Sequence, residues 1–149
     1  MAKYASETKV SVSKSKIEIE NTLKKYGADQ FAYATQSDQA MVMFTLSNRQ
    51  IKFVLKMPNV EEFKRTPTGK LRIDSVVSTE YEKACRQRWR ALSLVIRAKL
   101  EAIESGISEL ENEFLANIVL PSGKTVAETI LPEVEKAYLT GDVPNLFLE

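Results

Sequence analysis

Arginine and lysine side chains repeat at helical spacing in the middle of the chain, where they could bind phosphate. The segment Lys83–Leu92 reads Lys-Ala-Cys-Arg-Gln-Arg-Trp-Arg-Ala-Leu and belongs to a long run without Gly or Pro. At 100° per residue, Lys83, Arg86, Arg90 and Arg97 lie on one side of a helix. The planar fork of arginine binds phosphate oxygens in pairs. This stripe therefore predicts an anionic ligand, either a nucleic acid or a small nucleotide.

The only tryptophan lies between the basic stripe and the apolar side of the same helix. Trp89 is therefore either a core residue, as aromatic residues at helical spacing usually are, or a platform on which a base stacks. Two further cations precede the helix in a basic loop. Together these residues form the predicted ligand-binding set: Arg86, Arg90, Arg97, Lys70, Arg72 and Trp89.

Residue usage argues against most enzyme classes. The 149 residues include no histidine, which removes the commonest general base and the commonest transition-metal ligand. The single cysteine, Cys85, falls on the apolar side of the long helix and is expected to be a reduced core residue. We therefore expect a non-enzymatic protein with no cofactor and no bound metal. A nuclease using a carboxylate-bound metal is the less favoured alternative.

Charge is unevenly distributed along the chain although the net charge is only +1. Residues 1–59 carry nine basic and five acidic side chains, residues 60–100 carry ten and five, and residues 101–149 carry two and ten. The two ends either neutralise each other in the fold or bind separate partners. An alternative function is therefore protein–protein inhibition by the acidic C-terminal half, with Glu109, Glu111 and Glu113 as the test residues.

Hydropathy predicts a cytoplasmic protein that does not engage a membrane. No apolar run approaches the roughly 18 residues that a membrane span requires. The first residues, Met-Ala-Lys-Tyr-Ala-Ser-Glu, lack the apolar core of a signal peptide. An apolar segment at Leu146–Leu148 must instead dock on its own chain or on a neighbour, which suggests a homodimer.

The N-terminal part of the chain predicts one helix followed by three strands. After a loose lead at 1–12, Ser15 and Glu18 have capping-box spacing and predict a helix over about 14–26 that Gly27 ends. Alternating apolar residues then predict an antiparallel meander with strands at 30–35, 40–46 and 50–57, which Pro58 ends.

The remaining residues predict a mobile basic loop and then helices. The loop covers 59–78, and a long helix follows at about 79–105 with Gly106 as its stop. A shorter helix is expected at 108–116. Thr125 and Glu128 form a second capping box, which opens a helix to about 139 with Pro132 inside it.

These elements predict an α+β fold: a short three-stranded antiparallel sheet flanked by helices, with a long central helix and a helical C-terminal extension packed alongside. Residues 13–149 are expected to form a single domain. Its parts are a helix with a β-meander at 13–58, the mobile basic loop at 59–78, the long helix at 79–106 and the acidic helical extension at 107–149.

The segment Ser122-Gly-Lys-Thr is similar to the end of a phosphate-binding P-loop. That motif also needs a glycine five residues before the Gly-Lys pair, and Ile118 occupies this position. A tight turn ahead of a capped helix therefore explains the segment.

Two cations fall beside the apolar stripe of the long helix instead of on its basic side. Helical projection places Arg88 and Lys99 there, where a charge needs a partner. We expect them to contact glutamates of the acidic C-terminal helices or to reach through the core edge into a pocket.

Five segments resemble a family of small uncharacterised proteins of tailed bacteriophages and prophages, and the resemblance covers nearly the whole chain after Val10. They are Tyr26-Gly-Ala, Thr66-Pro-Thr-Gly-Lys, Cys85-Arg-Gln-Arg-Trp-Arg-Ala-Leu, Lys99-Leu-Glu-Ala-Ile-Glu-Ser-Gly-Ile and Glu113-Phe-Leu-Ala-Asn-Ile-Val-Leu-Pro-Ser-Gly-Lys-Thr-Val. The resemblance implies the bacterial cytoplasm during infection and a task such as genome handling, host takeover or counter-defence. A host protein is then the partner of the alternative, inhibitory function.

The order of the predicted elements is also similar to that of double-stranded RNA-binding domains, in which a helix, three strands and a helix follow one another. Those domains place a basic helix end across phosphates. Their characteristic Gly-Pro-x-His segment has no counterpart in this chain, so the likeness is one of architecture.

Overall fold

The computed structural model describes residues 5–143 and has the predicted α+β architecture. Its sheet consists of β1 (Gln30–Thr35), β2 (Gln39–Leu46) and β3 (Arg49–Lys56), paired antiparallel in the order β1-β2-β3. Ser47 and Asn48 both have positive φ and form the two-residue turn between β2 and β3. This conformation matches the twist of adjacent strands, which is why such turns are favoured in hairpins.

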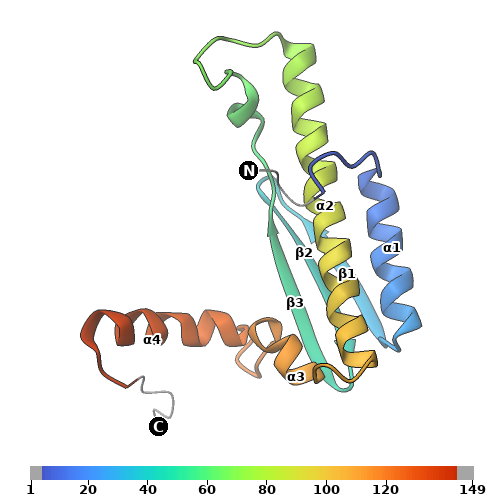
Figure 1. The fold of residues 1–149 in the computed structure, drawn as a ribbon, viewed down its shortest axis with the longest axis vertical. Helices are drawn as coiled ribbons and strands as arrows, with labels where there is room; N and C mark the ends of the chain where they lie inside the picture. The colour runs from blue at the N-terminus through green and yellow to red at the C-terminus, as the bar shows by residue number, and fades with distance from the viewer. Residues whose placement is uncertain (1–4, 144–149) are drawn as a thin grey trace.

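Two helices cover one face of the sheet, and they run parallel to each other (Figure 1). They are α1 (Val12–Lys25) and α2 (Asp74–Glu104). Every second residue of β2 is buried beneath them, as expected for a strand with one covered face. The core consists of these β2 residues, one residue of β3, one stripe from each helix and two residues that follow α2: Ile19, Leu23, Ala40, Val42, Phe44, Leu46, Ile51, Trp89, Leu92, Ile96, Leu100, Phe114 and Ile118.

Helix α1 begins one turn before the position that the capping pattern predicts. The Ser11 hydroxyl accepts a hydrogen bond from the Lys14 amide at 3.1 Å and is therefore the N-cap. Ser15 is instead 0 % exposed in the helix interior. The predicted capping box at Ser15 and Glu18 is wrong, because Ser15 is a small member of the buried stripe that continues through Ile19 and Leu23.

The basic segment between β3 and α2 has a defined local structure where the sequence predicts a mobile loop. It contains the short 3-10 helix η1 (Val60–Phe63), which Asn59 caps. A bridge between Arg65 and Leu71 then closes a turn. Helix α2 starts at Asp74, five residues earlier than predicted. The segment therefore forms a folded tip beyond the end of the sheet (Figure 1).

The predicted helix at 108–116 is instead two short helices, α3 (Leu110–Glu113) and η2 (Leu115–Asn117). Phe114 separates them and is 0 % exposed. Its ring makes edge contacts with the rings of Phe44 and Phe53, at centroid distances of 5.8 and 6.1 Å. The chain breaks the helix here because Phe114 closes the end of the core.

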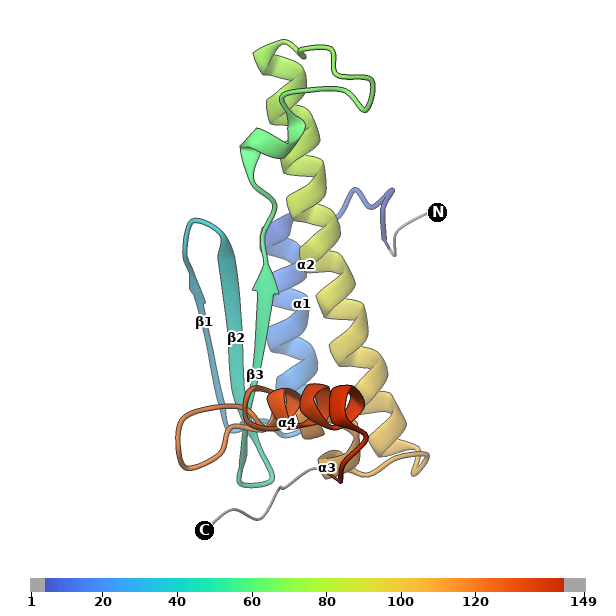
Figure 2. The same ribbon diagram turned by 90° about the vertical axis from the view of Figure 1, so that its left-hand side faces the viewer.

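The last helix, α4 (Val126–Thr140), confirms its predicted capping box but not its predicted position. Thr125 and Glu128 form the capping box, and Gly141 ends the helix with φ of 76°. The turn before it is tight, as expected: Gly123 has φ of 90° and its amide donates to the Leu120 carbonyl at 2.8 Å. Instead of packing alongside the domain, α4 projects away from it (Figures 1 and 2).

Candidate nucleic-acid interface

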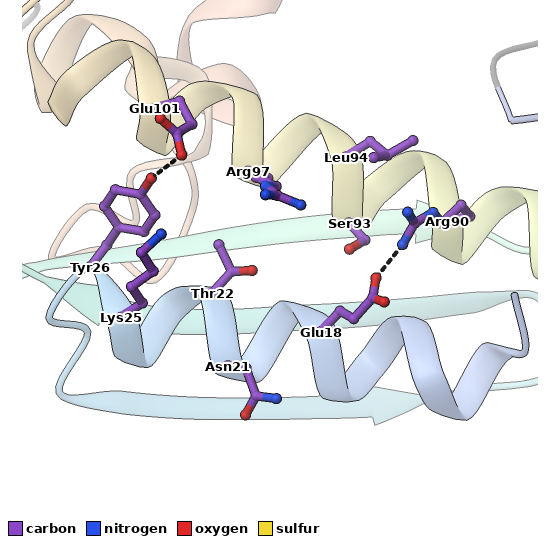
Figure 3. Close-up of a pocket in the computed structure, with 10 residues that line it drawn as sticks. All are labelled: Glu18, Asn21, Thr22, Lys25, Tyr26, Arg90, Ser93, Leu94, Arg97 and Glu101. Atoms are coloured by element: carbon purple, nitrogen blue, oxygen red, sulfur yellow. Dashed lines mark hydrogen bonds and ion pairs between the residues drawn. The ribbon is translucent and has the colours of Figure 1, made fainter. Parts of the chain in front are cut away.

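Two of the predicted ligand-binding arginines, Arg90 and Arg97, line one shallow groove between α1 and α2 (Figure 3). The groove exists because the parallel helices pack through their buried stripes and leave polar side chains along the outer seam. Its volume is about 280 Å³. The lining residues are Glu18, Asn21, Thr22, Lys25, Tyr26, Arg90, Ser93, Leu94, Arg97 and Glu101.

Arg90 is already partnered within the fold. Its guanidinium forms an ion pair and hydrogen bond with the Glu18 carboxylate of α1. Both side chains remain partly accessible to solvent. A phosphate that binds Arg90 must therefore compete with a carboxylate for the same guanidinium, and this competition weakens the contact.

Arg97 is exposed and lies between two contacts that join the helices (Figure 3). One contact is Arg90 with Glu18; the other is the Tyr26 hydroxyl, which donates a hydrogen bond to the Glu101 carboxylate. This hydrogen bond raises the pKa of Tyr26 above 10.0. Within residues 5–143 Arg97 makes no ion pair, so its guanidinium is available to an anionic ligand.

Arg86 lies one helical turn before Arg90, beside the start of α1. It borders a second cavity of about 360 Å³ together with Ser11, Val12 and Tyr81. No acidic side chain in the described part of the chain forms an ion pair with it. The neighbouring cation of the predicted stripe, Lys83, lies 3.9 Å from the Glu7 carboxylate. Arg86 is thus a second cation available for a ligand.

Lys70 and Arg72 lie in the folded tip that precedes α2. The Arg72 guanidinium donates to the Phe63 carbonyl at 3.3 Å, which anchors the tip, and the Lys70 side chain is exposed. The helix rises about 1.5 Å per residue, so Arg97 lies about 35 Å along α2 from Asp74. The predicted cations therefore form an extended row and do not surround one pocket.

Trp89 is not available to stack on a ligand beside this row of cations. Its side chain is 2 % exposed and belongs to the core. The Lys16 ammonium also lies 4.8 Å from the centroid of its ring. The prediction that Trp89 stacks on a ligand is wrong, because the neighbouring helix and the sheet cover the ring. An aromatic ring at the edge of an amphipathic stripe is turned inward once a second helix packs beside it.

Lys99 and Arg88 lie beside the apolar stripe of α2, and each takes one of the two expected arrangements: contact with a C-terminal glutamate or a place at the edge of a cavity. The Lys99 ammonium donates to the Glu113 carbonyl at 2.9 Å and lies 3.4 Å from the Glu113 carboxylate, so the predicted contact with the acidic C-terminal part is confirmed. Arg88 instead borders a largely apolar cavity of about 480 Å³ beside β3, which Phe53 and Leu55 also line.

The acidic residues chosen to test the alternative function are partly engaged inside the fold. Glu111 binds Arg49 at 3.1 Å, and Glu113 binds Lys99. Opposite charges at the two ends of the chain therefore neutralise each other at these positions, which weakens the argument that the acidic half is a separate binding surface.

Other kinds of site find little support in the described residues. Within residues 5–143 no three Cys, Asp or Glu side chains are grouped so that they could hold a metal ion. Cys85 is free and half-buried, and burial raises the pKa of its thiol. No helix in the described part of the chain is long and apolar enough to span a membrane. The Leu146–Leu148 segment lies outside the described residues.

The contribution of α1 to the groove is not evident from the periodicity of α2. Lys25 and Glu18 line the same groove as Arg90 and Arg97. The Lys24-Lys25 pair just before Gly27 is the sequence signal that could have indicated it, because it adds charge at the end of the adjacent helix. Comparison with known proteins found no match to this chain among protein-family models, curated proteins or solved structures.

Proposed function

We propose that this protein binds the phosphate backbone of a nucleic acid along α2 and the tip before it, and that it does so without catalysing a reaction. The observation that carries the proposal is the extended row formed by Lys70, Arg72, Arg86 and Arg97. Arg86 and Arg97 lie about 17 Å apart along the axis of α2, and Lys70 and Arg72 precede the start of this helix, which lies about 35 Å from Arg97. Arg86 and Arg97 are not neutralised by ion pairs within residues 5–143.

The length of this row favours a nucleic acid over a small nucleotide. Duplex DNA carries about one negative charge per 1.7 Å of axis, so a long ligand meets several cations at once. A mononucleotide in the groove of about 280 Å³ would meet only Arg90, Arg97 and Lys25, and Arg90 is already paired with Glu18. A small nucleotide signal is therefore the weaker candidate.

The chemistry of the row also favours binding to the backbone over reading of bases. Cations that contact phosphates position a nucleic acid without reporting its sequence. The one aromatic residue in the predicted set, Trp89, is buried and offers no ring face to a base. We therefore propose binding with little dependence on sequence.

The biological setting of the proposal rests on the resemblance to phage and prophage proteins alone. In that setting the protein acts in the cytoplasm of an infected bacterium, in host takeover or counter-defence. Inhibition of a host protein through the acidic half is the alternative.

The test is fluorescence anisotropy with labelled duplex DNA, duplex RNA and single-stranded oligonucleotides over a series of salt concentrations. Each phosphate contact to duplex DNA makes the slope of log K against log salt more negative by about 0.9. We expect Arg86→Gln and Arg97→Gln each to weaken binding and to make that slope less negative by about one. An unlabelled mononucleotide should not compete.

The matched control is Lys124→Gln, which also removes one positive charge but lies in the turn before α4. It should leave both affinity and slope unchanged. An equal loss in this variant would mean that net charge and not the row on α2 controls binding. No binding by the wild-type protein at about 50 mM salt would overturn the proposal.

A further inference from the structure

Helix α4 is amphipathic, yet it has almost nothing to pack against in its own chain. At helical spacing, Val126, Ile130, Val134 and Ala137 share one face with Leu131 and Tyr138; Glu133 and Glu135 flank this face, and Lys136 lies on the opposite side. None of its described side chains is buried, and Leu131 and Tyr138 are 60 % and 89 % exposed. A helix of 15 residues is only marginally stable without tertiary packing. Its apolar face therefore indicates a missing partner.

The sheet also has a face without a packing partner, because α1 and α2 cover only its other face. In Figure 2, α4 lies in front of the sheet and the two long helices lie behind it. The register places Ala34, Met41 and Val54 in one row across the uncovered face, and Ala32, Met43 and Lys52 in the next. The face therefore has an apolar centre with cations at β3, and Val54 is 51 % exposed.

Charge makes the two surfaces complementary. The uncovered face carries Lys52 and Lys56 on β3, whereas α4 carries Glu128, Glu133 and Glu135. The first of these glutamates already lies 4.0 Å from the Lys52 ammonium of its own chain. The start of α4 is thus placed at the outer face of the sheet, but the rest of the helix projects away from it (Figures 1 and 2).

We propose that two copies of this chain exchange their α4 helices, so that each helix covers the outer face of the partner's sheet. A two-fold arrangement forms this contact twice and buries both apolar surfaces at once. The lengths agree, because α4 is about 22 Å long and an eight-residue strand is about 26 Å long. The occupant of the sheet face is a second copy, since the chain itself carries the complementary helix. The inference is independent of the proposed nucleic-acid binding.

The first measurement is the solution mass of the full chain by light scattering, over protein concentrations from about 1 to 100 μM. Specific interfaces of standard size form in this range. We expect twice the chain mass of 16.8 kDa. A monomer throughout the range would overturn the proposal.

Three variants then test which surfaces meet. Leu131→Glu places a charge on the apolar face of α4, and Val54→Glu places one on the outer sheet face. Both side chains are exposed within one chain, so the fold of each protomer should survive, which far-ultraviolet circular dichroism will verify. Each change should yield a monomer. Lys136→Gln, on the polar side of α4, changes the net charge by the same amount as Leu131→Glu and should remain dimeric.

Mixing the two monomeric variants distinguishes arm exchange from other dimers. A mixture of Leu131→Glu and Val54→Glu still contains an intact helix on one chain and an intact sheet face on the other. It should therefore recover a heterodimer through one of the two contacts. A dimer that pairs α4 with α4, or that joins the exposed edges of β1, would leave Val54→Glu dimeric, and that result would contradict the proposal.

Discussion

The Arg90 guanidinium of α2 binds the Glu18 carboxylate of α1, and this ion pair crosses the groove that holds the most accessible cation of the helix, Arg97 (Figure 3). The pair has two effects. It fixes α1 beside α2, and it places a negative charge within the row that is proposed to bind phosphate. Glu18 therefore stabilises the fold but should weaken the proposed binding of phosphate.

Removal of that negative charge should strengthen nucleic-acid binding. Glu18→Gln releases Arg90 and removes repulsion of the ligand, so we expect a gain of about 1 kcal/mol, roughly fivefold in Kd at low salt. Anisotropy titration measures it. Glu20→Gln is the matched control, because Glu20 pairs with Lys24 on the same helix and does not line the groove. Equal gains in both variants would point to a general charge effect.

Trp89 should behave as a core residue in every assay. Its fluorescence should be blue-shifted and poorly quenched by iodide, because the ring is 2 % exposed. Trp89→Ala should lower the free energy of unfolding by about 3–5 kcal/mol. Trp89→Phe keeps most of the apolar volume and should preserve nucleic-acid affinity. Strong quenching of Trp89 by an oligonucleotide, with loss of binding in Trp89→Phe, would restore the stacking hypothesis.

Lys99 should stabilise the end of the domain through Glu113. Lys99→Met keeps the apolar part of the side chain but leaves the Glu113 carbonyl and carboxylate without their donor. We expect a loss of about 1–3 kcal/mol in urea denaturation. Glu113→Gln keeps the carbonyl contact and should cost less. In a double-mutant cycle the two changes should not be additive; full additivity would mean that the contact contributes nothing.

The Tyr26–Glu101 hydrogen bond should make stability depend on pH in alkaline solution. Because the folded state raises the pKa of Tyr26 above 10.0, it holds the phenol proton more tightly than the unfolded state does. The stabilisation is complete below pH 10 and is lost as the pH rises through the folded pKa. Denaturant titrations between pH 9 and 11 should show this decline. Tyr26→Phe and Glu101→Gln should both reduce it, and unchanged pH dependence in the two variants would refute the assignment.

Cys85 should react slowly with thiol reagents in the folded protein. Burial raises the pKa of the thiol, so little thiolate, the reactive species, is present near pH 8. Absorbance assays with an aromatic disulfide should show slow modification in buffer and rapid modification in denaturant. Rapid reaction of the folded protein would identify Cys85 as an accessible, reactive site instead of a structural residue.

Much of the fold can be predicted from local sequence because its signals are local. Alternation of apolar residues and the Ser47-Asn48 turn locate the three strands within a residue at each end. The Thr125–Glu128 capping box and Gly141 bound α4 for the same reason. The Ser15–Glu18 pattern misleads, because Ser11 is an equally good cap one turn earlier and the sequence does not show that Ser15 is buried.

By itself the sequence determined the element types, the α+β class and the basic side of α2, since each follows from residue spacing on one helix or strand. Only the tertiary structure decided what those side chains meet. Packing of α1 beside α2 buried Trp89 and paired Arg90 with Glu18. Such contacts join residues far apart in the chain, so no local pattern encodes them. These contacts decide which cations stabilise the fold and which remain available to a ligand.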